Sequence, residues 1–381
     1  MGITNIRVLF KQHNKIGIQK KHISQYSGKK IAIDLNNYLY RFLYRNKKNN
    51  QNPYCYLRDV LQFIFFLRKN NVLPIFVIDG AVPPQKLKTI EERCKKKESV
   101  QNKIIDLIEE VNDTLSKNLD DATVDEIIHE VKEISAEVIP TIDQFTVGNN
   151  KLGDMLPNDI KNKILQIDTL SNQCIYVTKQ DKLYTTALFR YLGIPYVYSP
   201  WEADDMCGYL YKNGYVSACM SEDMDFLAHG VGHLLRQFNT FTGQLMEYHL
   251  DNICSDLKLS FSEFLDMCIL CGTDYYKIKG LGPKTAYKMI LKDKSIEKCI
   301  NKIIQNEKYN LSADNKDSFN YKEIRQLFMK YMNSPEYPKR INSKDLNLGN
   351  LRWDKCHKLI RIIGFNKLTK EKVEKKMKYD G

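Results

Sequence analysis

Two short apolar runs, each followed by an acidic residue, stand out in the first third of the chain. Residues 30–33 (KIAI) precede Asp34, and residues 74–78 (PIFVI) precede Asp79. Their length and their β-branched residues are typical of buried strands. Between them, apolar residues recur at helical spacing over residues 56–69. The pattern therefore predicts a strand, a helix and a second strand.

Strands that alternate with helices predict an α/β fold in which helices flank a twisted, parallel-rich sheet. Two later apolar runs, at residues 196–198 and 217–220, add strands to this sheet. Ligands of such sheets gather beyond the carboxyl ends of the strands. Asp34 and Asp79 stand where that rule places a site.

The stretch between residues 86 and 182 follows a helical period instead. Residues 86–103 are basic, and apolar residues continue at helical spacing over residues 104–115 and again over residues 124–138. With a polar break at residues 118–121, this pattern predicts a helical hairpin that projects from the α/β core. An ordinary solvent-exposed helix pair without a special function explains the same pattern.

Charge is distributed unevenly along the chain, whose net charge is +12. Residues 105–143 hold twelve acids and two lysines, a net of −10, so the remaining residues carry +22. Residues 276–381 hold 26 basic and 12 acidic residues, a net of +14. A basic protein with one acidic insertion indicates a polyanionic partner such as nucleic acid, although a Lys-rich surface can also serve solubility alone. No apolar run approaches the roughly 18 residues of a membrane span, so no membrane association is expected.

The spacing of the ten cysteines and of two neighbouring histidines does not indicate a zinc site. In an intracellular chain, as we expect this one to be, cysteines are free thiols. Cys268 and Cys271 form a C-x-x-C, but no second pair at zinc spacing accompanies them, which favours core cysteines on a helix. His229 and His233 lie in the Gly-rich stretch HGVGH and are interpreted as loop residues.

The chemistry is carried by acids in short motifs at the ends of apolar runs. Any one of them is explained by a helix cap or a surface charge, but all of them together in one pocket require compensating cations. Oxygen-only ligands select Mg²⁺ or Mn²⁺, and two such ions activate water and stabilise the leaving oxygen of a phosphodiester. The seven acids are Asp34, Asp79, Glu202, Asp204, Asp223, Asp225 and Asp274.

These motifs resemble those of the structure-specific 5′ nucleases of the flap endonuclease family, almost from end to end. The matching blocks are MGI, GKKIAIDLNNYLYRFL, VIDGAVPPQKLKTIEER, LGIPYVYSPWEADDMCGYL, SEDMDFL, CILCGTDY and KIKGLGPKTAYKMI. The resemblance implies a PIN-like nuclease core, a helical arch over the active site and a helix-two-turn-helix DNA-binding element. It also implies a phosphodiesterase that uses two Mg²⁺ ions at junctions of single- and double-stranded DNA.

The resemblance assigns roles to the acids and to two cations. It groups Asp34, Asp79, Glu202 and Asp204 around a first metal and Asp223, Asp225 and Asp274 around a second, with Asp34 and Asp225 among the catalytic residues. The family often has Glu where Asp204 stands. Lys86 and Arg93 match a Lys and an Arg at the base of the arch that reach the scissile phosphate. Their seven-residue spacing puts both on one helix face, where a solvated basic face is the alternative.

Further DNA contacts are also implied by the resemblance. Tyr40 matches a tyrosine that stacks on a base, and Lys47 stands where an Arg often contacts DNA. Phe63 falls where another basic contact is expected. Close backbone approach to the substrate is implied at Gly2 and Gly272, and DNA contact also at Glu202 and Asp274. The DNA-binding hairpin, which in the family also holds a K⁺ ion, is carried by Gly280, Gly282 and Lys284.

Four regions follow from these assignments. They are an N-terminal nuclease region (1–99), a helical arch with the acidic insertion (100–175), an internal nuclease region that completes the same core (176–275), and the helix-two-turn-helix with a basic C-terminal region (276–381). We expect residues 105–143 to restrain the access of DNA or to bind a basic partner protein.

The predicted function is a Mg²⁺-dependent 5′ flap endonuclease with 5′→3′ exonuclease activity in DNA replication or repair. Gap, bubble, Holliday-junction or RNA preference remains an alternative, as does a non-catalytic protein that binds DNA junctions. We expect a monomer that works in the nucleus if the protein is cellular, or in a viral replication compartment, which can be cytoplasmic, if it is viral. No sliding-clamp motif is recognisable, so clamp dependence is not predicted.

Overall fold

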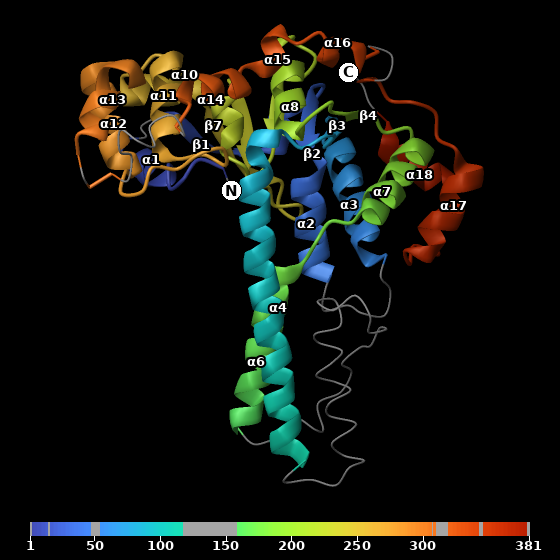
Figure 1. Ribbon diagram of the computed structural model, residues 1–381. Helices are drawn as coiled ribbons and strands as arrows, with labels where there is room; N and C mark the ends of the chain where they lie inside the picture. The colour runs from blue at the N-terminus through green and yellow to red at the C-terminus, as the bar shows by residue number, and fades with distance from the viewer. Residues whose placement is uncertain are drawn as a thin grey trace.

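A seven-stranded mixed sheet forms the centre of the computed structural model, which describes residues 2–13, 16–46, 54–116, 158–306, 308–309, 319–342 and 346–378. The strand order is β1-β7-β6-β5-β2-β3-β4 (Figure 1). The strands are β1 (Ile18–His22), β2 (Lys30–Asp34), β3 (Leu73–Ile78), β4 (Tyr196–Tyr198), β5 (Ala218–Met220), β6 (His233–Arg236) and β7 (Gln244–His249).

The α/β fold class is confirmed, with β6, β5, β2, β3 and β4 pairing in parallel. All four predicted strands are present, as β2 to β5. The strands β1, β6 and β7 were not predicted, because polar residues interrupt them and they contain no continuous apolar run. The loop interpretation of His233 was wrong, since this residue begins β6 and pairs with His249 of β7.

Helices cover both faces of the sheet because its strands bury both faces. Along β2, Ile31 and Ile33 pack on one face while Ala32 packs on the other. The first face is covered by α2 (Leu35–Asn46), α3 (Cys55–Lys69), α7 (Lys179–Leu192), α17 (Trp353–Ile362) and α18 (Lys370–Met377). On the second face, α8 (Ala203–Lys212) and α10 (Leu250–Leu257) contact strands of the sheet. The same apolar cluster continues outward through α1 (Arg7–His13), α9 (Asp225–Ala228), α11 (Phe261–Cys271), α12 (Pro283–Asp293), α13 (Ile296–Ile304), α14 (Tyr321–Phe328) and α15 (Lys330–Asn333).

A pair of helices projects from this body (Figure 1). The 30-residue helix α4 (Leu87–Ser116) packs against α6 (Asn158–Ser171), with Ile104 and Val111 buried against Ile160 and Ile167. The basic stretch 86–103 and the apolar stretch 104–115 thus belong to one helix, which begins before the predicted boundary at residue 100. The predicted break at 118–121 and the second helix at 124–138 lie outside the described residues, and α6 was not predicted.

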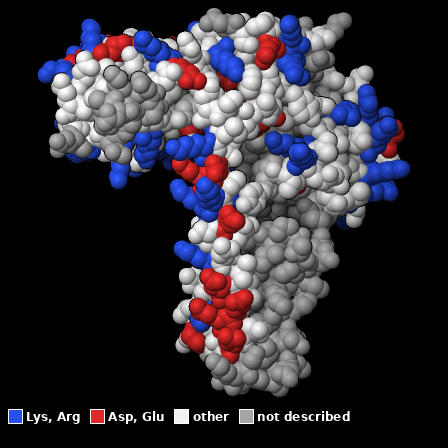
Figure 2. Space-filling view, in the orientation of Figure 1, with Lys and Arg blue, Asp and Glu red and all other residues white. Residues whose placement is uncertain are grey.

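Charge is polarised along this projection. Figure 2 shows Asp and Glu side chains gathered toward its far end and Lys and Arg side chains nearer the body. On α4 the exposed acids of the far end include Asp106, Glu109, Glu110 and Asp113. The part of the acidic insertion that the structure describes is therefore the outer end of a packed helix.

The predicted region 276–381 is divided between two places. The helices α12 and α13 pack against α11, whereas α17 packs on α7 and α18 packs on α3. Short 3₁₀ and α-helical turns complete the chain: η1 (Ile23–Tyr26), η2 (Pro84–Lys86), η3 (Asn172–Cys174) and α16 (Glu336–Lys339). Cys268 and Cys271 are free and buried on α11, as predicted. No helix among the described residues has the length and apolarity to cross a membrane.

The buried carboxylate of Glu247 links β7 to the neighbouring strands β1 and β6 and to η1. Glu247 of β7 is 3% exposed and accepts hydrogen bonds from His233, at 2.7 Å to Nδ1, and from the hydroxyl of Tyr26, and it pairs with Lys21 of β1. Burial alone would raise the pKa of Glu247, but the bonds from His233, Lys21 and Tyr26 outweigh it and lower this pKa to about 2.

We expect Glu247→Gln to lower the free energy of unfolding by about 2 kcal/mol at neutral pH, because three partners lose a charged acceptor. A depressed carboxyl pKa stabilises the fold above its unfolded value of 4.5, and this contribution is lost as the pH falls toward about 2. The difference between variant and wild type should therefore shrink below pH 4.5 in urea unfolding curves.

Glu91→Gln is the control, because Glu91 pairs with Lys95 on the exposed surface of α4. It should change the free energy of unfolding by no more than about 0.5 kcal/mol. If the two variants are equally stable at pH 7, the role given to Glu247 is wrong.

Candidate active site

Two of the predicted acids meet at the carboxyl ends of neighbouring parallel strands. Asp34 ends β2, beside Val77 of β3, and Asp79 follows β3 directly. The Oδ1 of Asp34 accepts the backbone N–H of Asn37 at 3.2 Å, and its Oδ2 accepts the hydroxyl of Ser221 at 3.1 Å. Both side chains line one cleft.

The start of α8 brings two further acids to the same place. Glu202 is the N-cap of α8 and Asp204 lies in its first turn, where the helix dipole favours negative charge. The backbone N–H of Ala203 donates to Oδ1 of Asp79 at 2.8 Å, which ties the helix start to the strand end. Asn36 also donates to Asp79.

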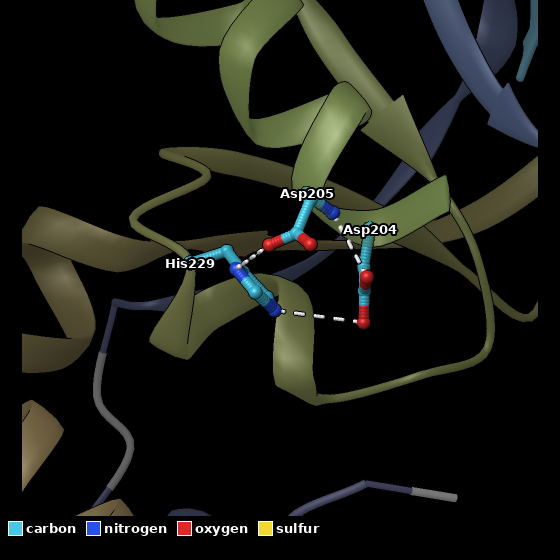
Figure 3. A group of neighbouring side chains, drawn as sticks. All are labelled: Asp204, Asp205 and His229. Carbon is cyan, nitrogen blue, oxygen red and sulfur yellow. Dashed lines mark hydrogen bonds and ion pairs between the residues drawn. The ribbon is translucent and has the colours of Figure 1, made fainter. Parts of the chain in front are cut away.

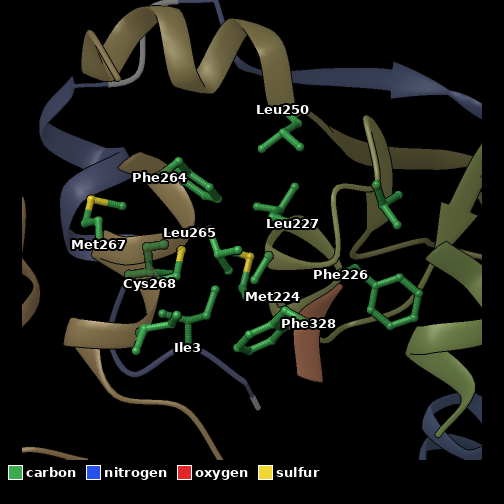
Figure 4. Packing of buried hydrophobic residues seen from close by; sticks show 14 of the residues in the cluster. Ile3, Met224, Phe226, Leu227, Leu250, Phe264, Leu265, Met267, Cys268 and Phe328 are labelled. Atoms are coloured by element: carbon green, nitrogen blue, oxygen red, sulfur yellow. The ribbon is translucent and has the colours of Figure 1, made fainter. Parts of the chain in front are cut away.

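Asp223 and Asp225 are held by the short helix α9, which follows β5. The apolar neighbours of Asp225, Met224 and Phe226, lie in the core that also contains residues of α11 (Figure 4). The backbone N–H of Asp225 donates to Oδ1 of Asp223 at 3.0 Å. Gly2 lies against both acids, since a Cβ on it would be 2.0 Å from Oδ1 of Asp223 and 2.7 Å from Oδ1 of Asp225.

The seventh acid, Asp274, follows α11 and faces two cations. Arg93 lies 2.6 Å from Oδ1 of Asp274, and Lys86 lies 3.4 Å from its Oδ2 and also bonds to Glu202. The hydroxyl of Thr89 donates to the backbone oxygen of Asp274. Both cations sit at the base of α4, so this helix is anchored over the acids.

A cleft of about 350 Å³ collects these groups. Six of the seven predicted acids line it, and Asp225 lies buried beside them, 3% exposed. The other side chains that line it include Asn36, Asn37, Tyr40, Val82, Lys86, Ile90, Arg93, Val177 and Phe226.

The charges of this cleft are not balanced by the protein. Burial and the neighbouring Asp79 raise the pKa of Asp34 to about 8, and burial and Asp204 raise that of Glu202 to about 7. Burial, with Asp223 alongside, holds the pKa of Asp225 well above its usual range. One oxygen of Asp225 is buried and has no hydrogen-bond partner among the described residues. An oxygen-rich pocket with more carboxylates than positive side chains fits hard divalent cations.

The residues proposed to contact DNA lie in different places. Tyr40 is 38% exposed at the mouth of the cleft, whereas Phe63 is fully buried in the core and offers no contact. Gly272 ends α11 with φ +96°. Gly280 and Gly282 form the turn before α12, and Lys284 is exposed on its first turn, away from the cleft lining. Lys47 lies outside the described residues.

Several polar residues of the site were missed by sequence reasoning. Asn36, Ser221 and Thr89 bond the predicted acids, and the hydroxyl of Tyr275 donates to Glu202 at 3.3 Å. These residues lie within or beside the motifs that contain the acids, and that position was the signal that could have identified them.

His229 lies in the turn after α9, as the loop interpretation predicted, but its burial and its partners were not expected. It is fully buried, with Nε2 3.5 Å from Asp204 and Nδ1 3.4 Å from Asp205 (Figure 3). Burial alone would lower its pKa, but Asp204 outweighs this and raises the pKa of His229 to about 9. For Asp204 the signs are reversed: burial alone would raise its pKa, but His229 and Lys86 lower this pKa to about 2.

Oxygen ligands at the ends of parallel strands, faced by a Lys and an Arg, define a metal-dependent phosphodiester hydrolase. The XPG N-terminal domain matches residues 1–100 and the XPG I-region matches residues 193–274. Flap endonuclease 1 of Enterocytozoon bieneusi is 28% identical, over 93% of this chain and 84% of that protein. A probable RAD2-like endonuclease, 369L, of Invertebrate iridescent virus 6 is 29% identical, over 87% of this chain and 80% of that protein.

Solved structures show the same fold. The catalytic core of Rad2 in complex with a DNA substrate has a TM-score of 0.61 at 16% identity, covering 99% of both chains. Flap endonuclease-1 from Methanococcus jannaschii has a TM-score of 0.55 at 20% identity, covering 94% of both. The chain is thus similar to the flap endonuclease family of structure-specific 5′ nucleases, and it is a nuclease.

Replacing Gly2 by Ala tests the packing of the acids directly. The φ of Gly2 is +82°, and the added methyl group would displace Asp223 and Asp225. We expect the single-turnover cleavage rate of Gly2→Ala to fall at least about tenfold, because a small misplacement of catalytic groups is costly.

Gly214→Ala is the matched control. Gly214 also has a positive φ, +71°, but nothing lies within 4 Å of its added Cβ. Both variants bear a similar backbone strain of about 1–2 kcal/mol, so a difference between them reports the clash with Asp223 and Asp225. Equal cleavage rates for the two variants would exclude a role of Gly2 in placing the acids.

Proposed function

We propose that this protein is a Mg²⁺-dependent 5′ flap endonuclease, with 5′→3′ exonuclease activity, that cuts DNA where single and double strands meet. The observation that carries the proposal is the convergence of seven carboxylates on one cleft beneath Lys86 and Arg93 of the projecting helix. The DNA-bound state of the structurally similar Rad2 core supports DNA as the substrate.

Two divalent ions, Mg²⁺ or Mn²⁺, fit the donor set. Asp34, Asp79, Glu202 and Asp204 would hold one ion and Asp223, Asp225 and Asp274 the other, since all their donors are carboxylate oxygens. The ions would supply an activated water and charge stabilisation for the leaving oxygen. The unpartnered buried oxygen of Asp225 supports this assignment.

The remaining groups position the strand. Lys86 and Arg93 would neutralise negative charge that develops on the scissile phosphate, and they are freed for this when ions replace them as partners of Glu202 and Asp274. Tyr40, exposed at the cleft, offers a flat ring to an unpaired base. Each residue thus acts on the phosphate or the base beside it.

The duplex would be held at the turn before α12. Gly280 has φ +85° and Gly282 caps α12, whose N-terminus favours anions, and a K⁺ ion at this turn would add to phosphate binding. The exposed residues Lys284, Lys288 and Lys292 repeat every four residues along α12 and would follow the phosphate backbone.

We place the protein in DNA replication or repair, as a monomer. Its compartment would be the nucleus of a cell or the replication compartment of a virus. A viral endonuclease is among its relatives, beside cellular ones, so both compartments remain in the proposal. These assignments follow the family and not a contact in the structure.

A labelled duplex with a 5′ flap provides the test of activity. Wild type should cut it near the junction in Mg²⁺ and leave it intact in EDTA. Asp225→Ala should lower the rate by roughly 1000-fold, because one ion loses a ligand at a step where metals contribute several kcal/mol. DNA affinity should remain within a few-fold of wild type, since phosphate contacts elsewhere dominate it.

Parallel substrates decide between the alternatives. Preference for gapped, bubble, four-way or RNA-flap substrates would assign a different specificity within the family. Tight binding without cleavage of any substrate would show a junction-binding protein instead.

The outer acids of α4 should restrain the access of DNA. Ile104 and Val111 in this segment pack against α6, so neutralising the exposed acids is a cleaner change than deleting residues 105–143. We expect Asp106→Asn/Glu109→Gln/Asp113→Asn to raise affinity for flap DNA or to relax discrimination against plain duplex. The effect should fade with salt, because exposed charges are screened over about 8 Å at physiological ionic strength.

The control carries the same change of charge on α17 and α18, as Asp354→Asn/Glu371→Gln/Glu374→Gln. Equal affinity and selectivity of the two triple variants at low salt would eliminate a local effect of the outer acids. Binding of a basic protein by residues 105–143, or a passive insertion without a function of its own, would then remain.

A further inference from the structure

A buried histidine bridges two carboxylates at the floor of the nuclease site. His229 ends α9, is fully buried, and packs its ring against Phe328 at 4.9 Å between centroids. Its Nδ1 lies 3.1 Å from the backbone oxygen of Phe328 and 3.4 Å from Oδ1 of Asp205, and its Nε2 lies 3.5 Å from Oδ2 of Asp204 (Figure 3).

The surroundings of the ring fix what its nitrogens do. A backbone carbonyl can only accept, so Nδ1 carries a hydrogen and donates to Phe328, while Oδ1 of Asp205 lies beside it at ion-pair distance. Nε2 lies 3.5 Å from Oδ2 of Asp204, and a hydrogen on Nε2 turns a repulsive contact into an attractive one. The ring thus presents N–H groups on both sides.

Asp204 is thereby held at both of its oxygens. Oδ1 accepts the backbone N–H of Asp205 at 2.8 Å, and Oδ2 faces His229. Asp205 contributes twice, through its backbone to Asp204 and through its side chain to the far edge of the ring. The hydroxyl of Tyr331 bonds the backbone oxygen of His229 and fixes the ring from behind.

This geometry does not suit one ion shared by Asp204, Asp205 and His229, although the three side chains are close enough to suggest it. The two carboxylates approach different nitrogens of the ring, Nδ1 already bonds the backbone oxygen of Phe328, and only Asp204 also lines the cleft. Asp204 therefore belongs to the cleft, whereas Asp205 and His229 are not part of its lining.

We propose that His229, braced by Asp205, is a positioning residue that orients the Asp204 carboxylate for the catalytic metal. This inference rests on the proposed metal-dependent nuclease function. His229 touches neither substrate nor ion, and its effect passes through Asp204. Groups that orient metal ligands in this way contribute about 10–100-fold to metal affinity or activity when they are removed.

Three substitutions separate orientation from packing. His229→Phe keeps an aromatic ring against Phe328 but loses both N–H groups. His229→Gln has the longer side chain, whose amide can reach Asp204 where Nε2 was. His229→Asn has the shorter one, whose amide can reach Phe328 and Asp205 where Nδ1 was but falls short of Asp204.

The first readout is Mn²⁺ binding to the DNA-free protein, by titration calorimetry, and the second is the Mg²⁺ dependence of single-turnover flap cleavage. We expect His229→Phe and His229→Asn to weaken Mn²⁺ binding about tenfold or more and to require correspondingly more Mg²⁺. His229→Gln should recover most of the Mn²⁺ affinity, and the KM for DNA should be unchanged throughout.

His357→Phe is the control, because Nδ1 of His357 also bonds a backbone carbonyl, that of Trp353 at 2.9 Å, but on α17 away from the cleft. Melting temperatures of all variants report folding. If His229→Phe does not fold, the comparison of His229→Gln with His229→Asn still decides.

Equal Mn²⁺ affinity and equal Mg²⁺ dependence of the folded variants and wild type would overturn the proposal. Equal defects in His229→Gln and His229→Asn would also overturn it, because they would show a packing role. Failure of the proposed function is separate, since wild type itself would then neither bind Mn²⁺ nor cut the flap.

Discussion

Repulsion among buried carboxylates is the constraint around which this molecule is arranged. Parallel strands bring Asp34 and Asp79 to one edge of the sheet, and helix starts and loops bring five more acids to the same place. Like charges so close together raise each other's pKa, as burial also does, unless cations intervene. Lys86, Arg93 and His229 supply part of that compensation within the chain. Divalent ions would supply the rest.

The projecting helix α4 links this constraint to the choice of substrate. Its base carries the cations that pair with acids of the cleft, and its outer end carries exposed acids. A single 30-residue helix therefore presents opposite charges at its two ends. DNA would meet attraction at the base and repulsion farther out, which favours a thin single strand over a duplex near the cleft. The packing of α4 on α6 keeps these charges at a defined height above the site.

The elements with strong local signals were predictable from the sequence. The runs before Asp34 and Asp79 gave their strands correctly, because strands buried on both faces are continuously apolar. The strands β1, β6 and β7 escaped prediction because polar residues interrupt them, and β1 also depends on a partner distant in the chain, as between Ile18 and Tyr248. The acids were found from their motifs, whereas His229 was not. Its glycine-rich setting resembles a loop, and only the folded chain places Asp204 and Asp205 on either side of its ring.

Anomalous scattering from crystals grown with Mn²⁺ tests the central claim, that the seven carboxylates form a metal site, most directly. The account predicts two Mn²⁺ peaks roughly 3.5–4 Å apart, one beside Asp34 and Asp204 and the other beside Asp223 and Asp225. Crystals of Asp225→Ala grown in the same way should lose the second peak. Peaks elsewhere, or none within reach of these carboxylates at saturating Mn²⁺, would contradict the account.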